Sequence, residues 1–172
     1  MTISREFTLT KSDAAIRQLE EAIILFFEDR DAISIHTLAT ASHQILRDID
    51  STCSFLDILE RDCVKDEFRK NVRDDYTRKA QNFFKHADKD KNATIAFKPA
   101  FTEFLIFDAT LMWLYAGGAK SIKLTAFLLW FSAKYPPVAN VMVKKPELAS
   151  MLKKHKNITQ RKDYFLRIIH EK

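Results

Sequence analysis

The apolar stretch at 99–116 constrains the fold of this chain more than any other feature of the sequence. It begins at a proline, whose missing N–H group suits the first turn of a helix, and it stops at Gly117 and Gly118, the only glycines present. Apolar residues fall on nearly every side of the helix it predicts, which is typical of a helix inside a core. Its length and its carboxylates, Glu103 and Asp108, argue against a membrane span.

The scarcity of turn residues indicates that the rest of the chain is also helical. Two glycines and four prolines in 172 residues leave little turn chemistry for a many-stranded sheet. Thr10 and Asp13 form a capping box that predicts a first helix, and Ser34 is expected to cap a second, antiparallel helix. We predict one all-α domain over residues 1–172, a bundle of six to eight helices around the central helix.

The remaining helices are predicted from apolar periodicity and from start signals. A short helix is expected at 55–59 and a long one at about 65–87. Ser121 is expected to cap an apolar helix that ends before a pair of prolines. Pro146 and Thr159 are expected to open the last two helices.

The cysteines and the first residues bear on the cellular compartment of the protein. Cys53 and Cys63 form neither a C-x-x-C motif nor a disulfide framework, which favours a reducing compartment. The first residues lack the basic-then-apolar layout of a signal peptide. We expect a cytoplasmic protein with no membrane partner.

The positive charge of the chain is concentrated in the C-terminal segment 144–172. This segment holds nine Lys or Arg and three Asp or Glu, whereas the other 143 residues hold 19 and 20. Such a segment can contact nucleic acid or an acidic partner. A solvated surface helix would carry the same charges, and the sequence leaves both interpretations open.

Two patterns that suggest a metal site are incomplete. The loop from Asp88 imitates the start of a calcium-binding EF-hand, but Ala93 stands where a glycine is needed and Pro99 where a glutamate is needed. His36 and His43 share a helix face but stand about 10 Å apart along the helix axis, too far for the usual two-histidine helical site. We expect no metal and no cofactor.

Asp108 is the anomaly of the central helix, because its neighbours Phe104 and Leu111 place it in or beside the core. A buried carboxylate is costly unless it is hydrogen-bonded or paired. His36 or His43 from the second helix is the most economical partner. The alternative is that the helix is rotated and Asp108 lies at a solvent-facing edge.

A cationic, hydrogen-bonding face is predicted on the long helix near residue 82. Arg78, Asn82 and His86 are spaced by four and project from one side, with Lys79 and Lys85 nearby. Such a face can bind a phosphate, and a neutral imidazole at its edge can move a proton. A wet helix face is the alternative interpretation.

The two predicted helices at 14–31 and 34–46 resemble the opening of HEPN domains, the higher-eukaryote and prokaryote nucleotide-binding family. The stretch Gln81-Asn-Phe-Phe-Lys-His86 is similar to that family's R-x-x-x-x-H motif, with Gln81 in the place of the arginine. The resemblance covers about residues 10–116. It implies a helical bundle and a catalytic histidine at His86. Many members are metal-independent ribonucleases in which the Arg and His meet across a dimer, whereas others have lost activity.

The leading hypothesis is an HEPN-like protein that binds RNA or nucleotide, with weak or lost ribonuclease activity and a possible homodimer. The candidate catalytic residues are His86, Asn82 and Arg78, and the candidate binding residues are Lys79, Lys85, Asp108, His36 and His43. The alternatives are a non-catalytic module for protein interaction or dimerisation and a metal-dependent enzyme built on histidines and Asp108.

Overall fold

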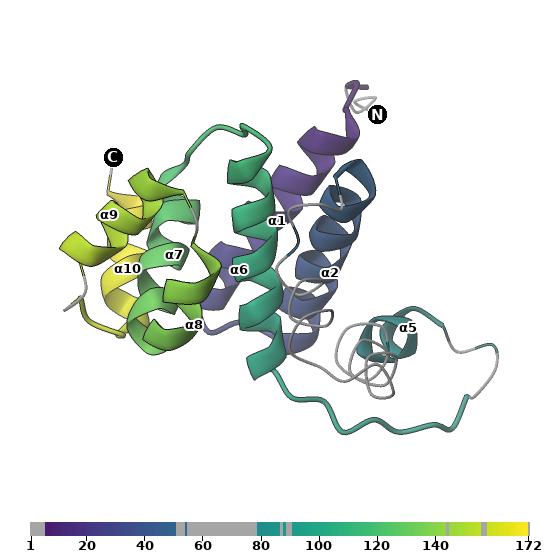
Figure 1. Cartoon of the computed structure of the whole chain (residues 1–172). Helices are drawn as coiled ribbons and strands as arrows, with labels where there is room; N and C mark the ends of the chain where they lie inside the picture. The colour runs from purple at the N-terminus through teal and green to yellow at the C-terminus, as the bar shows by residue number, and fades with distance from the viewer. Residues whose placement is uncertain are drawn as a thin grey trace.

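The computed structural model describes residues 6–50, 54, 79–86, 88, 91–143, 145–155 and 158–171. Within these ranges the chain forms eight helices and no strand, which confirms the predicted all-α bundle (Figure 1). The helices are α1 Lys11–Phe27, α2 Ala32–Ile49, α5 Lys79–Lys85, α6 Ala100–Tyr115, α7 Ile122–Lys134, α8 Pro136–Met142, α9 Pro146–Lys154 and α10 Lys162–His170. The helix predicted at 55–59, and most of the one at 65–87, lie outside the described residues.

Helix α6 occupies the centre of the bundle, as its composition predicts, with α1 and α2 on one side and α7 on the other (Figure 1). Contacts between α2 and α6 advance in step along both helices, from His36 with Thr102 to His43 with Asp108, so these two helices run parallel. Helix α1 turns back into α2 through a short link, which makes that pair antiparallel. The central helix is therefore packed on nearly all sides.

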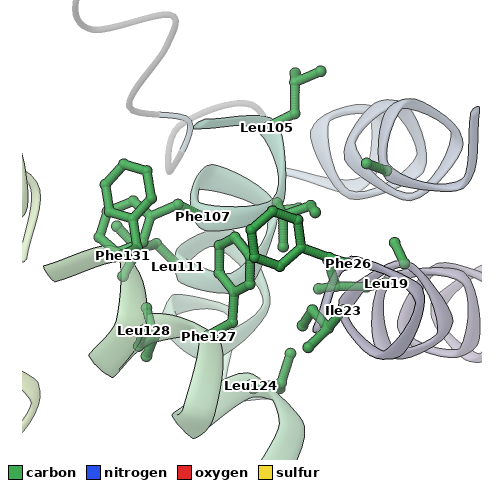
Figure 2. Close-up of a cluster of buried hydrophobic side chains, with 14 of the residues drawn as sticks. Leu19, Ile23, Phe26, Leu105, Phe107, Leu111, Leu124, Phe127, Leu128 and Phe131 are labelled. Atoms are coloured by element: carbon green, nitrogen blue, oxygen red, sulfur yellow. The ribbon is translucent and has the colours of Figure 1, made fainter. Parts of the chain in front are cut away.

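Aromatic side chains from α1, α6 and α7 fill the core (Figure 2). Phe107 of α6 stacks on Phe131 of α7 with ring centroids 4.0 Å apart. Phe26 of α1 meets Phe127 of α7 edge to face at 5.3 Å. Aromatic pairs in these geometries stabilise a core beyond the area they bury, so α7 is fixed to both of its neighbours.

The helix starts agree only in part with those predicted. The Thr10–Asp13 capping box is present at α1, and Ser121 caps α7. Helix α2 begins three residues earlier than predicted, because the carboxylate of Asp31 accepts from the backbone N–H of Ser34. Ser34 is therefore inside the helix rather than its cap, and the predicted start was wrong.

Two differences from prediction lie in the last third of the chain. Helix α8 starts at Pro136, where the proline pair was interpreted only as the end of α7. Prolines fit the first turn of a helix, so the same pair both stops one helix and opens the next. Helix α10 begins at Lys162, and the hydroxyl of Thr159 instead accepts from the backbone N–H of Arg161 in the preceding turn.

The glycine pair ends α6, as the sequence predicts. Gly117 has a φ of 84°, a left-handed conformation that favours glycine. A Cβ on Gly118 would collide with the ring of Trp113, which lies directly over this position. The indole Nε1 of Trp113 donates to the carbonyl of Ala119 at 2.9 Å, so the ring covers the turn and holds it.

Part of the basic C-terminal segment fastens the last helices to the bundle. The ammonium of Lys145 donates to the carbonyl of Leu114 at 2.8 Å, near the C-terminal end of α6. The ammonium of Lys162 donates to the carbonyl of Phe26 at 3.0 Å, at the end of α1, and pairs with Asp29 at 2.6 Å. Cations are favoured at helix C-termini, where unpaired carbonyls carry partial negative charge.

Over the ranges that the structure covers, no helix has both the length and the apolar character that crossing a membrane requires.

Replacing Phe165 by alanine should destabilise the fold by about 3–5 kcal/mol, the usual cost of truncating a buried phenylalanine. Its ring is fully buried on α10 and stacks on Phe27 of α1 at 5.4 Å. Tyr164, beside it, is 41% exposed, so Tyr164→Ala should cost only about 0.5–1 kcal/mol. Denaturant unfolding of the two variants measures both values, and equal costs would show that α10 is not docked through Phe165.

Candidate functional site

A buried polar seam joins α2 to α6, and it consists of His36, His43, Ser54, Thr102 and Asp108. The Nε2 atom of His43 lies 2.8 Å from Oδ2 of Asp108, and the hydroxyl of Ser54 donates to the same oxygen at 2.9 Å. Asp108 is fully buried and His43 is 7% exposed. The structure therefore confirms that Asp108 is buried and pairs with a histidine of the second helix, and its predicted alternative position at a solvent edge is wrong.

The chemistry of this seam is that of a structural contact. Nε2 of His43 and the hydroxyl of Ser54 both form hydrogen bonds to Oδ2 of Asp108. Ser54 donates to Asp108 and is not aligned as a nucleophile activated by His43. Asp108 is shielded from water, and its contact with His43 links α2 to α6.

His36 forms the second polar contact of the seam. Its Nδ1 atom lies 2.9 Å from the hydroxyl oxygen of Thr102 on α6. The ring is fully buried, and burial lowers the pKa of His36 to about 4. His36 is therefore neutral at neutral pH. The two histidines contact α6 at separate heights, and within the described ranges no three metal-ligating side chains come together.

A second polar cluster, which sequence reasoning missed, joins the start of α6 to the end of α7. The ammonium of Lys134 donates to both carboxylate oxygens of Glu103, at 3.0 and 2.7 Å, and the hydroxyl of Tyr135 donates to Glu103 at 2.9 Å. Glu103 is 9% exposed, so these bonds satisfy an almost buried carboxylate. Residues so far apart in sequence give no local signal for this contact.

Three residues of the face predicted near position 82, Lys79, Asn82 and His86, border an open cleft beside α5. This α5 cleft has a volume of about 620 Å³. Its lining, among the described residues, consists of Lys79, Asn82, Phe83, His86, Asp88, Ala93, Thr94 and Ile95. Lys79, Asn82 and His86 face the same space because they fall on one side of the helix and its last turn. The segment 93–95 closes the opposite wall.

A smaller hollow of about 260 Å³ adjoins the α5 cleft. The two spaces share Lys79, Thr94 and Ile95, and the smaller one adds Phe97, Lys98 and Phe101 to its walls. Sequence reasoning did not include Lys98 or the phenylalanines in the site. Phe97 and Lys98 belong to the connection into α6, whose path no periodic pattern predicts, and Phe101 lies in the first turn of α6.

The other predicted site residues that the structure describes do not line the α5 cleft. Lys85 is exposed but is absent from its described lining, and Arg78 lies outside the described residues. Asp108, His36 and His43 lie in the buried polar seam, which makes them structural in this arrangement.

The polar seam supports the cleft through a group of three rings. His36 of α2 meets Phe84 of α5 edge-on at 5.8 Å and Phe97 of the connection at 5.0 Å. Phe84 and Phe97 also contact each other at 5.2 Å. Helix α5 and the connection into α6 therefore both contact the buried ring of His36.

Comparisons of the chain with protein-family models, with curated proteins and with solved structures found no match in any of the three.

Replacing Asp108 by alanine should destabilise the fold by about 3–5 kcal/mol, because His43 and Ser54 lose their buried acceptor. Glu21 is exposed on α1, and Glu21→Ala should stay within about 0.5 kcal/mol of the wild type. Denaturant unfolding at neutral pH measures both. A loss of unfolding free energy for Asp108→Ala as small as that of the control would show that the contact between Asp108 and His43 contributes little to stability.

The neutral state of buried His36 should make the fold sensitive to acid. Between pH 6.5, near the pKa of an unfolded histidine, and the folded value of about 4, the unfolded chain binds a proton that the folded chain does not. The free energy of unfolding should therefore fall as the pH is lowered, by at most about 1.4 kcal/mol per pH unit from this group, and level off below pH 4.

This contribution can be isolated with His36→Phe, which keeps a ring at the position but removes the titrating group. Urea unfolding of both proteins across this pH range should show a shallower slope for the variant. Identical slopes would mean that His36 does not cause the acid sensitivity.

Proposed function

We propose that this protein binds RNA or a nucleotide in the α5 cleft. The observation that carries the proposal is that Lys79, Asn82 and His86, three candidate residues selected from the sequence, all line this cleft. A lysine supplies charge for a phosphate, and an amide and an imidazole supply hydrogen bonds for a base or ribose.

The surroundings of these residues support the same ligand class. Across the cleft and its adjoining hollow, Lys79 and Lys98 supply positive charge against the single described carboxylate of Asp88. Phe83 and Phe97 provide aromatic surface on which an unpaired base can stack. A phosphate and an aromatic base are the two parts of a nucleotide that such walls accommodate.

The proposal is for binding, with ribonuclease activity weak or lost. His86 is exposed and can exchange protons with a ligand, as the HEPN-like motif implies for the catalytic histidine. Gln81 occupies the place of the motif's arginine and brings no positive charge to a cleaved phosphate. A homodimer is part of the same family-based proposal, and light scattering of the purified protein measures it.

Reversing the charge of Lys79 should weaken RNA binding. Lys79→Glu should lower the affinity for a labelled single-stranded oligoribonucleotide about tenfold and reduce the salt slope of binding by about one, because a phosphate contact is lost. Fluorescence anisotropy at several salt concentrations measures both quantities. The control is Lys11→Glu, an equal charge change at the exposed start of α1. Equal effects of the two variants would contradict a site at α5.

If the purified protein cleaves RNA without added metal, His86→Ala should abolish that cleavage. The side chain of His86 is exposed, so the melting temperature of the variant should match that of the wild type. Cleavage that persists at the wild-type rate in the variant would assign the activity to another site or to a contaminant.

A further inference from the structure

A separate hollow lies among α7, α8 and α9. These three helices lie on the side of the bundle away from α5 (Figure 1). The volume of the hollow is about 360 Å³, within the range of small-molecule sites. The lining, among the described residues, consists of Leu129, Ser132, Ala133, Pro136, Ala139, Asn140, Leu152, Lys153 and His155. We call it the C-terminal hollow.

The walls of the C-terminal hollow are mainly apolar. Leu129 and Ala133 come from the face of α7 turned toward α8 and α9, and Ala139 and Leu152 come from those two helices. Alanines at two of these positions leave open space where larger side chains would fill it. An apolar group that entered the hollow would leave water on contact with these walls, which favours binding.

A lysine and a histidine line part of this hollow. Lys153 and His155 are exposed at the end of α9 and belong to its lining, and no carboxylate does so among the described residues. Neither side chain has a hydrogen-bond or ion-pair partner within the part of the chain that the structure describes. Lys145 and Lys162 of the same basic segment, by contrast, are bound to helix-end carbonyls. The positive charge at the hollow is therefore available to an anion.

One more polar atom on this wall lacks a partner. The hydroxyl of Ser132 is shielded from solvent and makes no hydrogen bond to any residue that the structure describes. A shielded hydroxyl without a partner is a cost to the folded state. It gives the apolar wall a polar group that a bound ligand with an oxygen atom can satisfy after a small side-chain rotation.

We propose that the C-terminal hollow binds a small amphipathic carboxylate, such as a medium-chain fatty acid. The alkyl chain lies against Leu129, Ala133 and Leu152, and the carboxylate pairs with Lys153 and accepts a hydrogen bond from the imidazole of His155. Charge complementarity selects the anionic end, and the apolar walls select the tail. The hollow is near the lower size limit of ligand sites, which favours a single short chain over a segment of another protein. This proposal is independent of the function proposed for the α5 cleft.

Isothermal titration of the full chain with octanoate tests the proposal. Octanoate should bind saturably, whereas octylamine, with the same tail and the opposite charge, and butyrate, with the same charge and a shorter tail, should bind much more weakly. Lys153→Glu should weaken octanoate binding about tenfold. The matched control is Lys154→Glu, an exposed lysine one residue further along α9 that does not line the hollow, and it should leave the affinity unchanged.

Ala133→Leu provides a second arm, because the larger side chain fills part of the hollow and should abolish binding. Its melting temperature reports whether it folds, and the two lysine variants decide the question if it does not. Absence of saturable octanoate binding, equal binding of octylamine, or equal effects at Lys153 and Lys154 would each overturn the proposal. Lys79→Glu should bind octanoate as the wild type does, which separates this site from the α5 cleft.

Discussion

The contact between Asp108 and His43 is the interaction on which the arrangement of this bundle depends. A fully buried carboxylate is tolerated only with a partner in place, and here the partner stands on α2. The contact therefore fixes the height and the rotation of α2 relative to α6, which apolar packing alone would fix less sharply. His36 and Thr102 repeat the constraint two turns away. Helix α6 also makes the aromatic contacts to α7. One helix therefore positions α2 on one side and α7 on the other.

The sequence predicted the fold class well because helical signals are local. The capping box at Thr10, the serine cap at Ser121 and the glycine pair after α6 each act within a few residues, and each is found as expected. The start of α2 failed because two polar residues competed for one role, whereas α8 and α10 begin without a side-chain cap. Asp31 and Ser34 are both good caps, and the sequence alone does not decide between them.

Site residues could be predicted from the sequence only where they lie on the same helix. Asn82 and His86 could be placed on one face from their spacing, and Asp108 could be recognised as a carboxylate in need of a partner. The wall formed by Thr94 and Ile95, and the contact of Glu103 with Lys134, depend on how distant segments meet. Such contacts form only in the tertiary fold, and no periodic pattern in the sequence predicts them.

The parallel orientation of α2 and α6 has a consequence for how this protein can diversify. Parallel neighbours in a bundle cannot be joined by a tight turn, so the return path between residues 50 and 99 joins opposite ends of the pair. Helix α5 and the wall opposite it belong to that return path. Changes of length or composition there can reshape the cleft while the register of α2 on α6 is preserved. The α2–α6 pair and the described walls of the cleft therefore come from different parts of the chain.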